Sequence, residues 1–111
     1  MPDPRDVNVA EALELVASGA LLLDVREDSE WEAGRAPQAT HVALNDVPDV
    51  LDDLPRDRVI VCVCRSGGRS SRAAKFLREQ GLDAVNLEGG MLAWANEDVE
   101  LVADVAEPTI D

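Results

Sequence analysis

The sequence predicts an α/β fold in which a mostly parallel sheet of about five strands is covered by helices on both faces. Helical patterns alternate with short β-branched runs along nearly the whole chain, and this alternation is typical of parallel sheets joined by crossover helices. The run 59–63 is apolar at every position and follows Arg58, as expected of a strand buried on both faces. With 111 residues, the chain is expected to form one domain.

The first half of the chain is expected to form two helices and two strands. Asn8 is a favourable N-cap for the first helix, and Gly19 is a natural residue to end it. In chain order, the elements are a helix from Asn8 to Gly19, a strand over 21–25, a helix from Asp28 or Ser29 to Ala33, and a strand over 40–43. The second helix lies between the two strands and can serve as their crossover.

The second half repeats the alternation around the apolar run. Its expected elements are a helical turn over 49–54, the central strand over 58–63, a helix over 69–80, a strand over 84–87 and a helix over 91–96. Gly81 follows the longest of these helices at a position where glycine commonly ends helices. The central strand is therefore expected to lead, through a short turn, directly into that helix.

The turn between that strand and that helix is the most informative segment, Cys64-Arg65-Ser66-Gly67-Gly68-Arg69-Ser70. Successive backbone N–H groups in such a turn, and the positive end of the helix dipole, point toward whatever lies inside it. A thiol with an ordinary pKa of about 8.5 is shifted toward thiolate by this environment and by nearby arginines. Cys64 is therefore predicted to be a reactive nucleophile; the alternative is a small buried side chain in the core.

The segment around Cys64 resembles the active-site loop of the rhodanese family of sulfurtransferases, single-domain type. Three other stretches resemble that family in the same order along the chain. They are Asp24-Val25-Arg26 followed by Glu30-Trp31, the segment 34–42 with Arg35 where the family usually has a His, and the segment 86–94 with Gly89-Gly90 and Trp94. The resemblance implies a rhodanese-like three-layer α/β/α domain, which we expect over residues 7–102 after an N-terminal extension 1–6. Residues 103–111, with Pro108 and terminal acids, are expected to form a loose acidic tail.

Loop length distinguishes sulfur chemistry from phosphate chemistry. Arg69 follows Cys64 in a Cys-x4-Arg pattern, whereas the related tyrosine-type phosphatases have one residue more. A phosphoryl group needs a wider cradle, in which several amides and a bidentate arginine contact its oxygens. The shorter loop favours a persulfide, so a phosphatase or arsenate reductase is the less favoured interpretation.

The resemblance implies a thiosulfate sulfurtransferase-like enzyme that works by double displacement. The Cys64 thiolate attacks the sulfane sulfur of a small anionic donor such as thiosulfate, sulfite leaves, and a Cys64 persulfide remains. Cyanide, a small thiol or a protein thiol then accepts the sulfur, and no cofactor is implied. The alternative is a sulfur-relay or regulatory module that acts on a protein partner and turns over small donors slowly.

The loop is expected to bind the donor and to stabilise charge on the sulfur. The substrate-binding candidates are Arg65, Ser66, Gly67, Gly68, Arg69 and Ser70. Arg65 and Arg69 would attract the donor, or one of them would brace the loop, with Arg69 as the favoured binding residue. Serine hydroxyls would donate to the sulfur, although Ser70 is equally well placed as an N-cap. Gly67 and Gly68 are expected to provide backbone geometry, because glycine tolerates positive φ and close approach.

Three residues outside the loop are expected to support the site. Asp24 and Arg26 lie at the end of a predicted strand, where ligands gather in open α/β sheets. Their favoured role is structural, with the two side chains bracing each other or Glu30. Arg35 is expected to line the mouth of the site in place of the usual His, with plain surface charge as the alternative.

The charge of the chain is strongly asymmetric. Its formal net charge is −13, from 23 acids against 10 bases. Five of those bases lie within a segment that has no acid: Arg65, Arg69, Arg72, Lys75 and Arg78. This segment should attract a small anion to the loop, while the acidic remainder argues against a nucleic-acid partner. The acidic composition, with a single Lys, also leads to the hypothesis of a halophilic source; the alternative is an ordinary acidic bacterial domain.

The two cysteines and the single histidine predict a reduced compartment and no metal. Cys62 and Cys64 emerge on the same face of one strand, where a disulfide would be strained, so the cytoplasm is the expected location. Cys62 is expected to be core packing, with a resolving redox role as the alternative. His41 has no metal-ligand spacing around it. No apolar stretch approaches the roughly 20 residues of a membrane-spanning helix, so no membrane association is expected.

Overall fold

The computed structural model describes residues 6–110, and its centre is a five-stranded sheet whose pairings are all parallel. The strands are β1 (Asp6–Val7), β2 (Leu21–Asp24), β3 (Thr40–His41), β4 (Ile60–Val63) and β5 (Ala84–Leu87), in the order β1-β5-β4-β2-β3. The predicted α/β class and mostly parallel sheet of about five strands are confirmed, although only four of the five, β2 to β5, had been located in the sequence. Because β4 is the middle strand, the segment that leads into the Cys64 loop lies at the centre of the sheet.

β1 is a strand that the sequence did not predict. It has two residues, Asp6 and Val7, which is too short for a recognisable alternation. Parallel pairing with Asn86 and Leu87 of β5 forms it, so its existence depends on tertiary contact. Asp6 falls within the expected N-terminal extension 1–6, and the other five residues of that extension lie outside the described residues.

The helices begin and end close to the predicted positions, with one exception. They are α1 (Val9–Ala17), α2 (Asp28–Ala33), the 3-10 helix η1 (Leu44–Asp53), α3 (Gly68–Glu79) and α4 (Gly90–Ala95). Asn8 caps α1 as expected: its side-chain oxygen accepts a hydrogen bond from the Glu11 N–H at 2.8 Å, and the Glu11 carboxylate accepts one from the Asn8 N–H at 3.0 Å. This capping box satisfies N–H groups that the helix leaves unpaired.

The exception is η1. The sequence predicted a helical turn over 49–54, whereas the 3-10 helix begins at Leu44 and ends at Asp53. Pro48 lies inside it, and a proline without an N–H to donate suggests a loop when the sequence is read alone. Burial of Val47 in the core beneath α3 holds this segment in place, so packing rather than local preference decides its structure.

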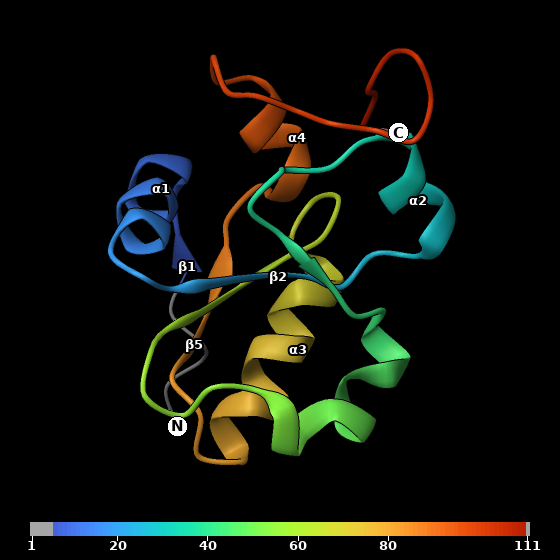
Figure 1. Cartoon of the computed structure of the whole chain (residues 1–111). Coiled ribbons are helices and arrows are strands. Elements are labelled where there is room, and N and C mark those ends of the chain that lie inside the picture. Colours follow the sequence, from blue (N-terminus) through green and yellow to red (C-terminus); the bar gives the residue numbers. More distant parts are fainter. Residues whose placement is uncertain (1–5, 111) are drawn as a thin grey trace.

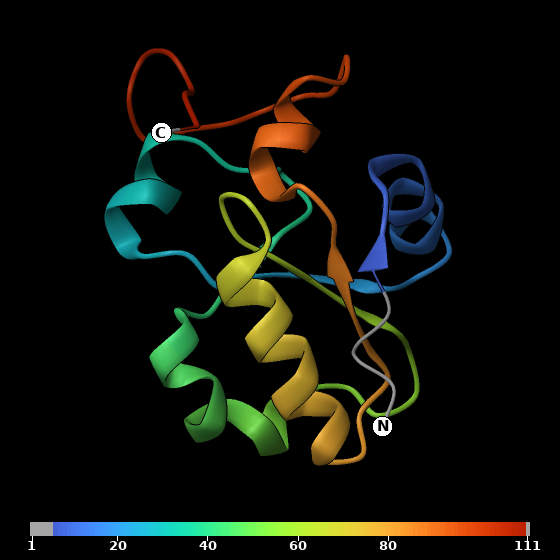
Figure 2. The same ribbon diagram turned by 180° about the vertical axis from the view of Figure 1, so that it is seen from behind.

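Helices cover both faces of the sheet, as predicted. α3 and η1 lie on one face, and α1 and α4 lie on the other (Figure 1 and Figure 2). Alternate residues of β4 supply the two cores, because successive side chains of a strand point to opposite faces. Ile60 and Cys62 belong to the core beneath α3, and Val61 and Val63 belong to the other core. All four are 0% exposed, so the strand that carries Cys64 is held from both sides.

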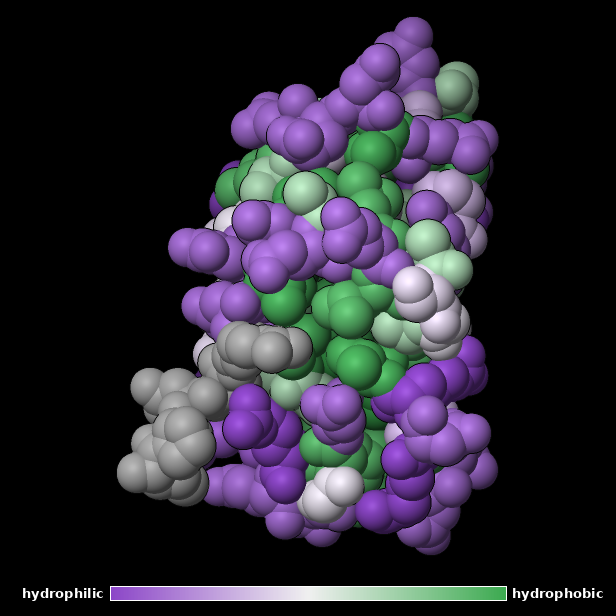
Figure 3. Space-filling view, turned by 90° about the vertical axis from the view of Figure 1, so that its left-hand side faces the viewer, coloured by the Kyte–Doolittle hydropathy of each residue, from purple (hydrophilic) through white to green (hydrophobic). Residues whose placement is uncertain are grey.

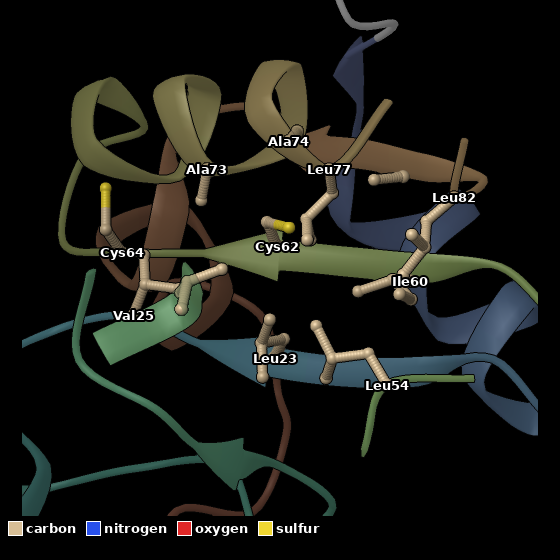
Figure 4. Packing of buried hydrophobic residues seen from close by; sticks show 12 residues of the cluster. Leu23, Val25, Leu54, Ile60, Cys62, Cys64, Ala73, Ala74, Leu77 and Leu82 are labelled. Carbon is tan, nitrogen blue, oxygen red and sulfur yellow. The ribbon is translucent and has the colours of Figure 1, made fainter. Parts of the chain in front are cut away.

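The core beneath α3 also fixes the beginning of the Cys64 loop. In Figure 4, Leu77 and Ala73 of α3 face the sheet, with Cys62 beneath the helix and Leu23 on the neighbouring strand. The Cys64 side chain points toward the first turn of α3 (Figure 4). Leu77 is 0% exposed, and burial of such a side chain contributes about 2 kcal/mol. The helix is thus anchored independently of the loop that precedes it.

The C-terminal segment, expected to be a loose tail, makes regular backbone contacts. The Asp104 N–H donates to the Glu32 carbonyl at 2.9 Å, and the Thr109 N–H donates to the Ala33 carbonyl at 2.8 Å. Figure 1 shows this segment, in red, running past α2. A Cβ at Gly34 would collide with the Thr109 backbone. The described part of the segment therefore packs against α2 instead of extending into solvent, and the final residue lies outside the described range.

One face of the molecule combines hydrophilic and hydrophobic residues. Figure 3, which views the molecule from the left-hand side of Figure 1, shows hydrophilic residues around a hydrophobic band. Among the described residues, the large hydrophobic side chains that are well exposed are Leu92 at 37% and Val105 at 59%. No helix within residues 6–110 is long and apolar enough to cross a membrane. The chain as a whole carries a formal net charge of −13.

Candidate active site

The candidate site lies where β4 ends and α3 begins, at the carboxyl edge of the parallel sheet. Cys64 follows the last residue of β4, and α3 starts at Gly68. Gly67 makes the turn with φ of 114°, a left-handed conformation that favours glycine. Gly68 has no positive φ, and no atom lies within 4 Å of where its Cβ would be. Of the two loop glycines, backbone geometry therefore calls for Gly67 alone.

Hydrogen-bond donors converge on the Cys64 sulfur. The Gly67 N–H donates to Sγ at 3.1 Å, and the Ser70 hydroxyl oxygen lies 3.3 Å from Sγ. Burial by itself raises the pKa of the Cys64 thiol. Hydrogen bonds outweigh burial and lower that pKa, first from the Ser70 hydroxyl and then from the backbone N–H groups of Ser70, Gly67 and Ser66. The loop therefore favours a thiolate through hydrogen bonds more than through arginine charge.

The N-terminus of α4 holds the outer side of this loop. The Met91 N–H donates to the Cys64 carbonyl at 2.7 Å, and the Leu92 N–H donates to the Arg65 carbonyl at 3.0 Å. Gly90, with φ of 58°, leaves no space for a side chain, because its Cβ would collide with both carbonyls. With its carbonyls bound to α4, the loop can direct its N–H groups toward the sulfur. The Gly89-Gly90 pair thus brings backbone close to the loop, a role that the sequence left open beside plain packing.

A side-chain network that the sequence did not point to lies beside the sulfur. Ser70 is the third residue of α3 and not its N-cap. Its Oγ lies 2.6 Å from Asn86 Oδ1, and Asn86 Nδ2 donates to Asp6 Oδ1 at 3.0 Å. Ser70 is 0% exposed and Asn86 is 4% exposed. Asn86 interrupts the apolar strand 84–87, and a polar residue inside a buried strand is the signal that could have identified it, since such groups need partners.

Arg69 pairs with Glu30 of α2. Its two terminal nitrogens donate to the two Glu30 carboxylate oxygens at 2.7 and 2.9 Å. These hydrogen bonds lower the pKa of Glu30 to about 2 although partial burial opposes the change, and the same pair raises the pKa of Arg69. Arg69 therefore braces α3 against α2. Its expected contact with an anionic donor would require it to share this guanidinium with Glu30 or to release that carboxylate.

Asp24 and Arg26 form a buried ion pair where β2 ends. Arg26 Nη2 lies 2.7 Å from Asp24 Oδ2, and the two side chains are 1% and 0% exposed. Arg26 also donates to the backbone carbonyls of Gly34 at 2.7 Å and Glu30 at 3.3 Å. A buried charge pair needs its remaining donors satisfied as well, and here that need ties α2 to the sheet. We expected Asp24 and Arg26 to brace each other or Glu30, and these contacts fit that structural role. They also position α2, the helix that carries Glu30.

Arg35 makes its contacts away from the Cys64 loop. Its guanidinium lies 4.8 Å from the Trp31 ring centroid and pairs with Asp104 at 2.8 Å. His41 stacks on the same Trp31 ring, with centroids 4.7 Å apart. Within the described part of the chain, no hydrogen bond joins Arg35 to the loop 64–70. Residues 6–110 also contain no group of three or more His, Cys, Asp or Glu side chains that could hold a metal ion.

Cys62 has the opposite environment to Cys64. Burial raises the pKa of Cys62 to about 12, with a further contribution from the negative charge of Cys64. Cys62 packs in the core beneath α3, and both cysteines are free thiols.

Arg65 and Ser66 of the loop are exposed. The loop therefore places its two outermost side chains toward solvent while its N–H groups serve the sulfur.

Known proteins resemble this chain over most of its length. Residues 8–97 match the rhodanese-like domain family. The chain is 49% identical over 76 residues to a Bacillus subtilis protein named "Putative sulfurtransferase YtwF", covering 68% of this chain and 74% of that protein. It is 39% identical over 84 residues to an Allochromatium vinosum protein named "Sulfurtransferase", covering 75% of this chain and 78% of that protein.

A solved structure agrees with this match. The crystal structure of a rhodanese-related protein from Thermoplasma volcanium superposes with a TM-score of 0.81 at 31% sequence identity. The alignment covers 88% of this chain and 97% of that protein. The sequence match, the parallel five-stranded sheet and the loop between β4 and α3 are therefore consistent with one another, and the chain belongs to the rhodanese-like domain family.

Proposed function

We propose that this protein is a sulfurtransferase that moves a sulfane sulfur from a donor such as thiosulfate to a thiophilic acceptor through a persulfide on Cys64. The observation that carries the proposal is the convergence of loop N–H groups and the Ser70 hydroxyl on one sulfur atom, with Gly67 N at 3.1 Å from Sγ. Preorganised donors of this kind stabilise negative charge without reorganisation during the reaction. The sulfurtransferase names of two relatives support the same chemistry.

The cycle has two displacements. In the first, the Cys64 thiolate attacks the outer sulfur of thiosulfate, a sulfur–sulfur bond forms, and sulfite leaves with the electron pair of the broken bond. In the second, an acceptor thiolate or cyanide attacks the outer sulfur of the persulfide, and Sγ leaves as thiolate. Neither step needs a general base, because attacking and leaving groups are both competent anions. The Cys64 side chain is 1% exposed, which favours a small donor over a bulky one.

Phosphate chemistry is disfavoured by the contacts of Arg69. A Cys-based phosphatase needs an arginine that binds two oxygens of a tetrahedral oxyanion. Both terminal nitrogens of Arg69 already bind Glu30, at 2.7 and 2.9 Å. A phosphoryl group would have to displace that carboxylate within a loop that is one residue shorter than the phosphatase pattern. A single sulfur atom on Cys64 requires no such change.

Intact-mass measurement tests the proposal. The protein is incubated with thiosulfate, without reductant, and we expect a gain of one sulfur atom together with release of sulfite. Cys64→Ser should show neither, and Cys62→Ser should retain both. Failure of the wild-type protein to gain sulfur, from thiosulfate or from a small persulfide such as that of glutathione, would contradict the proposal. Gain from the persulfide with negligible gain from thiosulfate would instead identify a relay module that serves a protein partner.

Two free cysteines and no disulfide within the described residues suit a reducing compartment, because the nucleophile must remain a thiol between cycles. We accordingly place the proposed activity in the cytoplasm. The measurement is the redox state of Cys64 in cells of the source organism, by differential alkylation. A largely oxidised Cys64 would argue against this location.

A further inference from the structure

Asn86 is a buried polar residue of β5, and each end of its side-chain amide has a hydrogen-bond partner. Its Oδ1 lies 2.6 Å from the Ser70 hydroxyl oxygen, and its Nδ2 lies 3.0 Å from Asp6 Oδ1. Asn86 is 4% exposed and Ser70 is 0% exposed. Three elements, β1, β5 and α3, therefore meet in one chain of hydrogen bonds that ends 3.3 Å from the Cys64 sulfur.

The orientation of the Asn86 amide follows from Asp6. A carboxylate can only accept hydrogen bonds, so the amide must present its NH2 group to Asp6. The carbonyl oxygen of Asn86 is then the end that faces Ser70. Because an amide oxygen can only accept, the Ser70 hydroxyl must be the donor in that 2.6 Å contact.

Ser70 has one hydroxyl hydrogen and two acceptors within reach. When the hydrogen points to Asn86 Oδ1, a lone pair of Oγ faces Sγ and can accept from the neutral thiol. When Sγ is charged, a charge-assisted hydrogen bond to sulfur competes with the neutral one to the amide. Without Asn86, the hydroxyl hydrogen would lose its amide acceptor whenever Sγ is neutral, and a buried donor without an acceptor is unfavourable.

We propose that Asn86, oriented by Asp6, is a positioning residue that accepts the Ser70 hydroxyl hydrogen while Sγ is neutral and releases it to Sγ when Sγ carries negative charge. The inference rests on the proposed function for its place in the cycle. Sγ is neutral in the thiol and in the persulfide, whose charge lies on the outer sulfur. Sγ is negative in the free thiolate and as the leaving atom of the second displacement.

The second displacement is the step that this hydrogen serves best. The acceptor anion attacks the outer sulfur, a new bond to that sulfur forms, and the electron pair of the sulfur–sulfur bond moves to Sγ. The Ser70 hydrogen turns from Asn86 toward Sγ as that charge develops, and no proton leaves the enzyme. The Gly67 N–H donates to the same sulfur atom at 3.1 Å. Leaving-group stabilisation is thus divided between backbone and hydroxyl.

Other charged groups near the sulfur need to be distinguished from this network. The Arg69 guanidinium on α3 interacts electrostatically with Cys64. Cys62 on β4 interacts with it as well, but its own pKa of about 12 keeps it neutral over the range of interest. Asp6 reaches Cys64 only through Asn86 and Ser70. Variants at Asn86 leave both Arg69 and Cys62 in place, so their effect on Cys64 reports the network itself.

The test is the pH profile of Cys64 alkylation by iodoacetamide, which does not depend on sulfur transfer. Ser70→Ala removes the donor and should raise the apparent pKa, slowing alkylation below that pKa by about fivefold, the ordinary worth of one hydrogen bond. Asn86→Val removes the competing acceptor and should change the pKa in the opposite direction. Ser71→Ala, one residue further along α3, is the matched control and should leave the profile unchanged.

Two further variants sharpen the result. In the double variant Ser70→Ala with Asn86→Val, the second substitution should have no additional effect on the profile, because it acts only through the hydroxyl. Asp6→Asn frees the Asn86 amide to turn. It should shift the pH profile of Cys64 alkylation in the same direction as Asn86→Val does, but by a smaller amount. The discharge of preformed persulfide by cyanide should slow in Ser70→Ala and should not slow in Asn86→Val.

A shift of the Asn86→Val profile in the same direction as that of Ser70→Ala would overturn the inference, because it would make Asn86 simple structural support. So would an effect of Asn86→Val that persists in the Ser70→Ala background. If Asn86→Val does not fold, Asn86→Ala carries the same prediction, and far-UV circular dichroism identifies a variant that is folded. If the variants show these pH profiles but the wild-type protein gains no sulfur atom, the proposed function is refuted while the inference about Asn86 and Ser70 is retained.

Discussion

Cys62 and Cys64 are two residues apart, belong to the same core and differ in the property that decides thiol chemistry. Burial raises the pKa of Cys62 to about 12. Cys64 is equally buried by exposed area, at 1% against 0%, yet hydrogen bonds lower its pKa against the effect of burial. The difference lies in the backbone: Cys62 is inside a strand whose N–H groups pair with neighbouring strands, and Cys64 is at the strand end.

The comparison shows that burial alone does not decide the pKa of a cysteine. A strand uses its N–H groups for its own ladder, so a thiol within it gains no donors. A turn that leads into a helix has unpaired N–H groups to offer. At this site α4 binds the loop carbonyls, which leaves the opposite, N–H side of the loop for the sulfur. The most direct test of this difference is to measure the alkylation rates of both thiols in one protein.

The largest expected effect is the difference in alkylation between the two cysteines. A thiol with a pKa of about 12 is ionised in only about one molecule in 10⁵ at pH 7. Iodoacetamide should therefore label the native protein once, at Cys64, and Cys62→Ala should label at the wild-type rate. Peptide mapping checks the site. Labelling of Cys62 at a comparable rate in the folded protein would refute the comparison.

The second effect concerns the contact that orients the loop. Gly90→Ala places a Cβ against the carbonyls of Cys64 and Arg65 at a residue with φ of 58°. We expect a loss of about 2–4 kcal/mol in the free energy of unfolding, from strain and steric collision. Loss of loop order should slow Cys64 alkylation as well. Urea denaturation and the alkylation rate measure the two consequences.

Gly68→Ala is the matched control for this prediction. The position has an ordinary φ and open space around its missing Cβ. Alanine within a helix costs less than glycine, so the free energy of unfolding should stay the same or rise slightly. Equal destabilisation by both substitutions would contradict the assignment of Gly90 as the close-approach residue.

A smaller effect is expected at the ion pair beside the loop. The pKa of Glu30 is lowered from 4.5 to about 2, so the pair stabilises the fold above pH 4.5 and this contribution is lost as the pH falls toward 2. Glu30→Gln should cost on the order of 1 kcal/mol or less at pH 7, because the pair is partly exposed. Denaturation of both proteins between pH 7 and 2 should show the difference shrinking with acid. A constant difference would exclude this linkage.

The smallest effect on the two cysteines is expected from salt. The hypothesis of a halophilic source predicts that the fold is more stable in molar KCl than in dilute buffer, because the acidic surface repels itself less when screened. Contacts onto Sγ are short, so the Cys64 alkylation rate should change little over the same range. Thermal unfolding at both salt levels is the measurement. Equal stability in dilute buffer and molar KCl would end the halophile hypothesis.

Much of the fold could be predicted because local signals agree with it. The apolar run 59–63, the capping residue Asn8 and the turn at Gly67 each identify an element that the structure contains. β1 was missed because it is only two residues long. The start of η1 was misplaced because Pro48 lies inside it. Both are formed by contacts with distant parts of the chain. The packing of the C-terminal segment on α2 was missed for the same reason.

The candidate site divides in a similar way. Cys64 and its loop were identifiable because strand, turn and helix follow one another in the chain, and the chemistry of N–H groups at a helix start is local. The pairing of Glu30 with Arg69 and the contact of Asn86 with Ser70 were not predicted, because the partners are 39 and 16 residues apart. No spacing in a single sequence indicates such pairs. Arg35 was expected to line the mouth, which stays a prediction, and its contacts with Trp31 and Asp104 could not be read from the sequence.

The sequence was enough to predict that Cys64 is the candidate nucleophile and to count the residues between it and Arg69, because both depend only on neighbours along the chain. Tertiary structure alone decided where that arginine points, which carbonyls bind α4, and which side chains share the Ser70 hydrogen. Those features depend on which strand lies beside which, and the order β1-β5-β4-β2-β3 is a property of the packed sheet. Local preference cannot specify it, since hydrophobic burial is non-directional and many pairings bury the same residues.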